Sequence, residues 1–303
     1  MSLPPDPSVI SGIHTPVFAR LPDPVALFRQ RAARLRQLAD GARLAPYLRF
    51  LADLADVQAA LAAATPPPER LGTAEITRNR SHHMPPIDRA AMIASGDMVE
   101  MLALFLTRAE AVDMPAPARE ALHALRDAPE AERQALLGEL ACDRVPEGLA
   151  APALFAGAAL QLVAARLAAT LDGAALVPVG TGVCPACGGL PSVSMVTATR
   201  HQEGARYACC ATCTTAWNAV RVTCLCCGST KGIGYRALEE DPEKAHIRAE
   251  VCNECHAWVK ILYQNRVPEF DAMADDIASL GLDAQMRATA WSRGGFNPFL
   301  TGY

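Results

Sequence analysis

The sequence predicts an α+β fold: an N-terminal all-α helical domain, two tandem four-cysteine β modules and a C-terminal helix. Two observations carry this prediction. Up to about residue 173, apolar residues recur at helical spacing, and aromatic residues make up only 5% of the chain. Beyond that point, 10 of the 11 cysteines fall between Cys184 and Cys255, among short runs of β-prone residues.

The helical domain is expected to span residues 23–176, after an N-terminal arm at 1–22 that holds five prolines. Asp23 followed by a proline has the form of an N-cap and a first-turn proline, so a helix is expected over 24–39. A second helix is expected over 46–61, where leucine and valine form one apolar stripe.

Two segments of this domain depart from an ordinary amphipathic pattern. Residues 64–87 are bracketed by proline runs and are interpreted as a loop, either a solvated connection or a partner-docking loop. Residues 148–165 carry no charge and just reach the length of a membrane span. Because this run is rich in alanine and glycine and contains Pro152 and Gln161, a buried core helix is favoured over membrane insertion.

The second half of the chain alternates cysteine pairs with strand-like runs. Strands are expected at 193–199, 217–223, 233–238 and 257–263. The first module is predicted at 177–218, the second at 219–266, and the C-terminal helix and tail at 267–303. The apolar residues of that last segment step by three and four, which predicts one helix over 268–290.

Four C-x-x-C pairs share no residue. Two residues between thiolates allow a tight turn to aim both sulfurs at one ion. We therefore predict two four-cysteine metal sites of the zinc-ribbon type. Site one is Cys184, Cys187, Cys210 and Cys213, and site two is Cys224, Cys227, Cys252 and Cys255. Pairing the first pair with the third and the second with the fourth is the alternative, but it closes longer loops.

Three cysteines and two histidines are left outside these sites. Cys209 and Cys226 each adjoin a predicted ligand and are expected to point away from the ion, with ligand substitution or a disulfide on oxidation as the alternatives. Cys142 is expected to be a small buried apolar residue in a helix. His246 and His256 are expected to be polar surface residues or hydrogen-bond partners rather than ligands, because four cysteines already fill each tetrahedron.

The predicted sites limit the chemistry. Four protein thiolates leave no open position for substrate or activated water, which disfavours a hydrolytic metalloenzyme, and we predict that the protein is not an enzyme. Such tetrahedra hold zinc or iron, and the spacing does not separate the two. Two roles are therefore compatible with the sequence: a structural metal site that stabilises a small β module, and an iron site that transfers electrons or senses redox state. A redox enzyme with free C-x-x-C thiols is a further alternative, although no βαβ pattern surrounds the pairs.

Charge and cysteine usage indicate the partners and the compartment. The chain carries a formal charge of -4, and its cysteine-rich window holds seven Lys/Arg and seven Asp/Glu. Protein partners are therefore favoured over nucleic acid, with a nucleic-acid-binding or regulatory zinc ribbon as the alternative. Reduced cysteines are typical of the cytoplasm, and residues 1–6 show no basic or apolar signal-peptide region.

Short motifs beside and beyond the cysteine pairs provide a second signal. They are Tyr47-Leu-Arg-Phe50, Cys184-Pro-Ala-Cys187-Gly188, Arg206-Tyr207, Arg221-Val222, Lys260-Ile-Leu-Tyr-Gln264, Asp275-Asp276-Ile277-Ala-Ser-Leu280 and Asn297-Pro298-Phe299. In this combination the chain resembles the FdhE family of formate dehydrogenase accessory proteins, over most of its length.

The resemblance implies a cytoplasmic, non-enzymatic assembly chaperone that is needed for maturation of a respiratory, molybdopterin-containing formate dehydrogenase. It implies binding to the catalytic subunit of that enzyme, and it implies rubredoxin-like sites associated with iron. Two metal ions are therefore expected, iron by resemblance or zinc. The eight cysteines of the two sites match the family pattern, whereas Cys209 and Cys226 depart from it. The oligomeric state is open, and a homodimer is compatible with the sequence.

Overall fold

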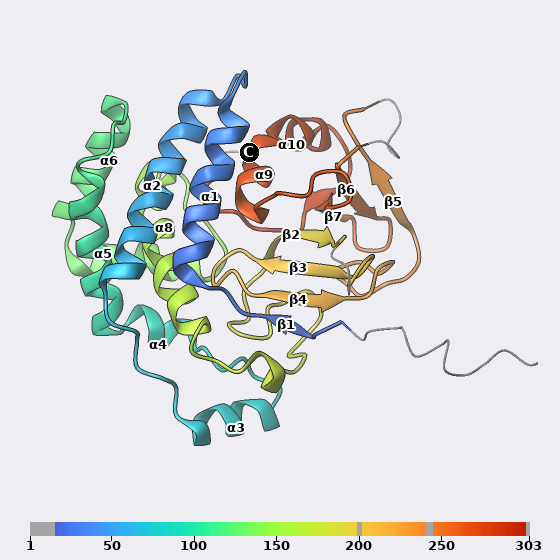
Figure 1. Ribbon diagram of the computed structural model, residues 1–303, viewed down its shortest axis with the longest axis horizontal. Helices are drawn as coiled ribbons and strands as arrows, with labels where there is room; N and C mark the ends of the chain where they lie inside the picture. Colours follow the sequence, from blue (N-terminus) through green and yellow to red (C-terminus); the bar gives the residue numbers. More distant parts are fainter. Residues whose placement is uncertain (1–15, 199–201, 240–244, 301–303) are drawn as a thin grey trace, which may run out of the picture.

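The computed structural model describes residues 16–198, 202–239 and 245–300, and it confirms the predicted α+β class. A helical region comes first and a β-rich region that carries both cysteine clusters follows (Figure 1). Residues 1–15 of the predicted arm lie outside the described part, as do residue 199 of one predicted strand and the last three residues of the tail.

Eight α-helices form the described part of the helical region. They are α1 (Pro24–Ala39), α2 (Ala45–Ala64), α3 (Thr73–Ser81), α4 (Arg89–Ile93), α5 (Gly96–Ala109), α6 (Ala116–Asp127), α7 (Glu130–Ala141) and α8 (Ala150–Ala168), followed by a 3-10 turn at Gly173–Ala175. The Asp23 side chain accepts a hydrogen bond from the Ala26 amide at 3.1 Å, which confirms the predicted N-cap of α1.

Helix α8 forms the centre of the helical core. Among the described helices it alone is long and apolar enough to span a membrane by length and composition, and 78% of its most apolar 18-residue window is buried. Helices α2, α5, α6 and α7 all pack against it. The Gln58 side chain of α2 donates to the Ala158 carbonyl of α8 at 2.8 Å. The expected core helix is therefore confirmed.

Two helix predictions were wrong in detail. The loop expected over 64–87 contains α3 (Figure 1). This helix buries none of its residues and therefore leaves no apolar stripe in the sequence. The single helix expected over 268–290 is divided at Ser279 into α9 (Ala272–Ala278) and α10 (Leu280–Arg287). The break changes the buried face, so that Leu282 and Met286 are buried while Ala284 is exposed.

The strands in the described part of the chain form one eight-stranded sheet. They are β1 (Ala19–Arg20), β2 (Pro191–Val196), β3 (Arg206–Cys210), β4 (Ala216–Ala219), β5 (Ile233–Arg236), β6 (Ile247–Cys252), β7 (Ala257–Tyr263) and β8 (Ser292–Arg293). The order is β1-β4-β3-β2-β7-β6-β5, and β8 also pairs with β7. The four strands expected from the sequence overlap β2, β4, β5 and β7, whereas β1, β3, β6 and β8 were not anticipated.

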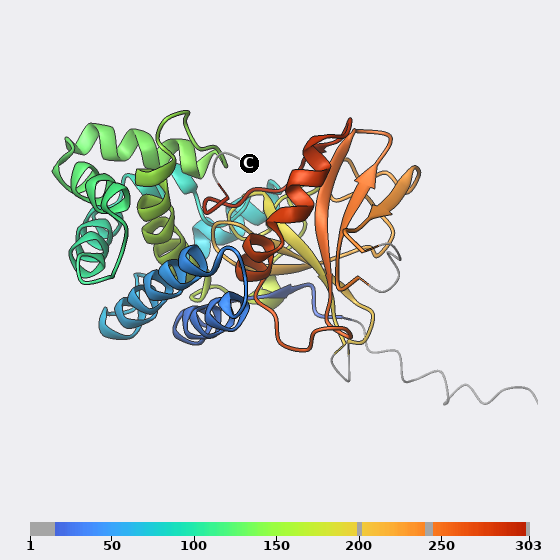
Figure 2. The ribbon, with the colours of Figure 1, turned by 90° about the horizontal axis from the view of Figure 1, so that it is seen from above.

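The two cysteine modules share this sheet. Within each module the strands are antiparallel, but β2 of the first pairs parallel with β7 of the second, from Ser194 opposite Ile261 to Val196 opposite Tyr263. Helices α9 and α10 lie on one face of the sheet, and α1 packs against α9 (Figure 2). Backbone pairing between β2 and β7 therefore joins the two modules into one sheet.

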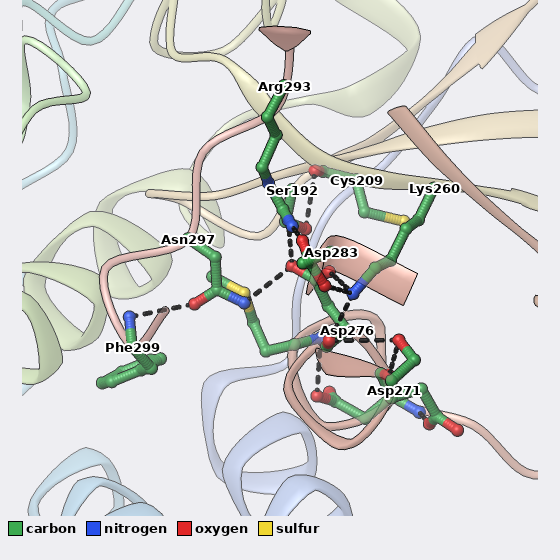
Figure 3. Close-up of polar contacts among 12 residues, drawn as sticks. Ser192, Cys209, Lys260, Asp271, Asp276, Asp283, Arg293, Asn297 and Phe299 are labelled. Carbon is green, nitrogen blue, oxygen red and sulfur yellow. Dashed lines mark hydrogen bonds and ion pairs between the residues drawn. The ribbon is translucent and has the colours of Figure 1, made fainter. Parts of the chain in front are cut away.

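A buried ion-pair network attaches α9 and α10 to the sheet (Figure 3). The Lys260 ammonium on β7 lies 2.9 Å from Asp276 Oδ1 and also contacts Asp283, and the Lys260 and Asp276 side chains are 0% exposed. Arg293 of β8 pairs with both aspartates, at 2.6 Å from Asp276 Oδ2. Burial by itself raises the pKa of Asp276, but Arg293 and Lys260 outweigh that effect and hold it below the usual value.

We expect Lys260→Met to lower the free energy of unfolding by about 3–5 kcal/mol, because it leaves buried aspartates without their ammonium partner. Arg36→Met is the matched control, since Arg36 makes exposed ion pairs with Asp53 and Asp56, and it should lose at most about 1 kcal/mol. Urea denaturation measures both. Equal losses in the two variants would contradict the role given to the buried network.

Candidate metal centres

The structure brings the eight predicted cysteines together in the two predicted groups. Within each group all four Sγ atoms lie within 4.8 Å of one another. In site one, the Sγ atoms of Cys184 and Cys213 lie 3.5 Å apart, as do those of Cys187 and Cys210. In site two, Cys224–Cys255 is 3.6 Å and Cys227–Cys252 is 3.8 Å. A tetrahedron with metal–sulfur bonds of 2.3 Å has edges of about 3.8 Å, so both groups fit one tetrahedral ion each.

All four C-x-x-C turns share one backbone feature. The residue after the second cysteine has a positive φ: 73° at Gly188, 60° at Thr214, 75° at Gly228 and 54° at His256. This left-handed residue reverses the chain behind the sulfurs. Glycine is the easy choice, and the other two turns adopt the strained conformation with threonine and histidine. His256 thus serves as a turn residue, outside the cysteine group.

Backbone amides point at the first sulfur of three turns. Cys184 Sγ accepts from the Ala186 amide at 3.4 Å, Cys224 Sγ accepts from the Cys226 amide at 3.3 Å, and Cys210 Sγ accepts from the amides of Thr212 and Cys213, each at 3.4 Å. Such donors stabilise negative charge on sulfur, which is the form that binds metal. The amide donors of these three turns therefore favour the thiolate form of Cys184, Cys210 and Cys224.

The remaining three cysteines lie apart from the two groups. Cys209 neighbours Cys210 on β3, where successive side chains point to opposite faces, and burial raises its pKa to about 12. Cys226 packs against Gly294, and burial followed by the charge of Cys224 raises its pKa to about 12. Cys142 was expected to be buried but is exposed, because α7 ends at Ala141 and leaves it at the C-cap.

Site one is enclosed between the helical region and the sheet. Gln161 of α8 donates from Nε2 to the carbonyl of Ala211, inside the second turn of the site, at 2.7 Å. Its Oε1 accepts from Arg31 of α1 at 3.1 Å. The Ile87 amide donates to the Ala186 carbonyl in the first turn at 3.0 Å.

A half-buried ion pair lies beside the same site. Arg89 of α4 is 3.0 Å from Asp143, whose Oδ2 also accepts from the Leu190 amide at 3.2 Å. Burial raises the pKa of Asp143, and Arg89 opposes that shift. No motif in the sequence predicted this pair. Gln161 is a polar residue within an otherwise apolar helix, and this feature of the sequence was the one signal that pointed to its buried hydrogen bonds.

Arg206 joins the two modules. Its side chain is 0% exposed and lies on β3 of the first module. It pairs with Glu250 on β6 at 2.7 Å and donates to the Thr223 carbonyl, just before site two, at 2.9 Å. Its Nε also donates to Ser194 Oγ at 3.2 Å. Burial raises the pKa of Glu250 while Arg206 lowers it.

Sequence models of the FdhE family match the chain in three consecutive parts. These are "FdhE, N-terminal" at residues 16–181, "FdhE, central domain" at 183–221 and "FdhE, C-terminal domain" at 222–300. The chain belongs to the FdhE family.

Whole-chain relatives agree with this assignment. A "Protein FdhE homolog" of Rhizobium meliloti is 52% identical over 299 residues, which cover 99% of this chain and 98% of the relative. A second, from Edwardsiella ictaluri, is 36% identical over 282 residues, covering 92% and 90%. The crystal structure of the FdhE protein from Pseudomonas aeruginosa superposes with a TM-score of 0.84 at 33% identity, covering 95% of this chain and 99% of that one.

The motifs that carried the family resemblance converge in the FdhE fold. Asn297 Nδ2 donates to Asp276 Oδ2 at 2.8 Å, and Asn297 Oδ1 accepts from the Phe299 amide at 3.0 Å (Figure 3). The Tyr47 hydroxyl of α2 donates to the Phe299 carbonyl at 2.6 Å. Together with Lys260, these residues attach the C-terminal segment to the sheet and to the helical region.

We expect Gln161→Leu to lower the free energy of unfolding by about 1–3 kcal/mol, because the buried Ala211 carbonyl and the Arg31 guanidinium each lose a partner. Gln134→Leu is the control: the Gln134 side chain on α7 donates to Glu130 at the surface, so a change within about 0.5 kcal/mol is expected. Denaturant unfolding of both variants is the measurement. A neutral Gln161→Leu would show that α8 does not support site one.

Proposed function

We propose that this FdhE-family protein is a non-enzymatic accessory protein for the maturation of a respiratory, molybdopterin-containing formate dehydrogenase. The observation that carries the proposal is the family match along nearly the whole chain, together with two closed four-cysteine groups. Four cysteines per group leave an ion no free position for a substrate. A binding role therefore suits this geometry better than hydrolysis.

The eight cysteines would hold two metal ions, iron or zinc. Both ions suit tetrahedral sulfur sites, and the sulfur positions do not separate them. A bound ion would crosslink two turns. An iron ion could also gain or lose one electron. The chain supplies the amide donors at sulfur and the enclosing contacts from Gln161, Ile87 and Asp143.

The partner we propose is the catalytic subunit of the dehydrogenase, bound in the cytoplasm through this metal-stabilised scaffold. The formal charge of -4 and the even charge balance around the cysteines support a protein partner over nucleic acid. The 78% burial of the apolar window in α8 supports a protein that does not insert into membranes. A homodimer stays compatible with the proposal.

Purified under exclusion of oxygen, the protein should contain two metal ions per chain. Cys252→Ser removes one ligand of site two and should lower the content to about one ion, whereas Cys142→Ser should leave it at two. Metal analysis and visible absorption make the measurement. A coloured protein whose visible absorption is reversibly lost on reduction contains iron. A colourless protein with two ions per chain contains zinc. Fewer than two ions in the unmodified protein would contradict the two-site assignment.

Tagged protein, expressed in cells that make the dehydrogenase, should recover its catalytic subunit. Cys252→Ser should recover less, because the scaffold loses one crosslink, and Cys142→Ser should recover as much as the unmodified protein. Mass spectrometry of the captured proteins is the measurement. If no dehydrogenase subunit is captured, the accessory role fails. Salt-sensitive capture of nucleic acid would instead support the zinc-ribbon alternative.

A further inference from the structure

The two cysteine groups differ sharply in their exposure to solvent. In site one, all four cysteines are at most 2% exposed. In site two, Cys224 and Cys252 are buried, at 5% and 1%, but Cys227 and Cys255 are solvent-exposed. The sulfur geometry is similar in both groups, so the difference lies in what surrounds them.

Site one is covered by parts of the chain that must separate before a chelator or a thiol can reach it. Its first turn is bonded to Ile87, and its second turn is bonded to Gln161 of α8. Its four cysteines also belong to the same continuous core as α1, α2, α5 and α8. Reaching its sulfurs therefore requires the helical region to open from the sheet, which is a large-scale unfolding event.

Site two is held mainly through the turn that carries Cys224. On its inner side, Gly182 lies so close to the Leu225 carbonyl that an added Cβ would sit 2.1 Å from that oxygen. Cys226 is packed equally tightly on Gly294, where a Cβ would sit 2.3 Å from the sulfur. These contacts fix the turn that carries Cys224.

The outer side of site two faces solvent. Cys227 is followed by exposed Gly228, and Cys255 lies in a stretch of exposed residues at 253–256. Cys227 and Cys255 can therefore be approached from solvent without any change in the fold.

We propose that site two is an exchangeable metal site and that site one is a permanent one. This inference rests on the proposed metal binding. An incoming thiolate or chelator would replace Cys227 or Cys255 at the ion first, one ligand for one ligand, while Cys224 and Cys252 still hold it. Further replacements release the ion to the incoming ligands and leave four cysteine sulfurs behind. No electron is transferred, and the ion keeps its charge.

The two metal sites would then have different roles. The ion of site one would fix the two turns that Ile87 and Gln161 contact, while the ion of site two could pass to or from the thiolates of a partner protein. The surface around the turns that carry Cys227 and Cys255 is then where a metal-dependent partner would contact this protein.

The test follows release of metal from the fully loaded protein into an excess of a chromogenic chelator. One equivalent should leave at least about 100-fold faster than the second, with the helical circular dichroism unchanged during the fast phase. Alkylation with iodoacetamide during that phase, mapped by mass spectrometry, should label the cysteines of site two and spare those of site one.

Matched variants assign the two phases. Cys227→Ser and Cys187→Ser change the second cysteine of the first turn in site two and site one, respectively. Cys227→Ser should abolish the fast phase and keep one slowly released ion. Cys187→Ser should keep the fast phase, and if it fails to fold, the alkylation map of the unmodified protein still decides the assignment.

Three results would count against the inference. Release of both equivalents in a single phase, or early alkylation of Cys184, would overturn it while leaving the proposed metal binding intact. A protein that binds no metal at all would overturn both proposals. The two failures are therefore distinguishable.

Discussion

A buried charge without a partner costs several kcal/mol, and this constraint decides how the parts of the protein dock. The Lys260 and Arg206 side chains are 0% exposed, so each must meet its carboxylate in the folded state. Lys260 attaches α9 to the sheet through Asp276 and α10 through Asp283, and Arg206 attaches the first module to the second through Glu250. Each contact joins segments distant in the sequence, and each therefore specifies one arrangement.

The same arrangement makes the two cysteine groups unequal. Locally they are near repeats, with the same C-x-x-C turns, the same left-handed residue after each pair and similar sulfur spacing. Helices α1 and α8 lie over the first group, and Gln161 connects both helices to its second turn. Two cysteines of the second group, Cys227 and Cys255, are exposed. Thus one group belongs to the core of the molecule, while the other stands at the surface where a partner can reach it.

Sequence reasoning succeeded where the signal is local. The pairs of cysteines, the capping aspartate Asp23 and the apolar run of α8 each describe a few neighbouring residues, and each lies in the structure as expected. It failed where no local signal exists. Helix α3 buries nothing and so leaves no periodicity, and the break at Ser279 changes a helical face without interrupting the apolar spacing on which the prediction relied.

The sequence by itself determined the fold class, the two groups of four cysteines and the family. Ligand spacing, helical periodicity and short motifs each depend on residues that are close together in the sequence. Only the tertiary structure decided that β2 pairs with β7, that Gln161 supports site one and that Cys227 and Cys255 face solvent. These features depend on contacts between residues far apart in the chain. Burial and register are set jointly by all the segments that meet, so no single stretch of sequence contains them.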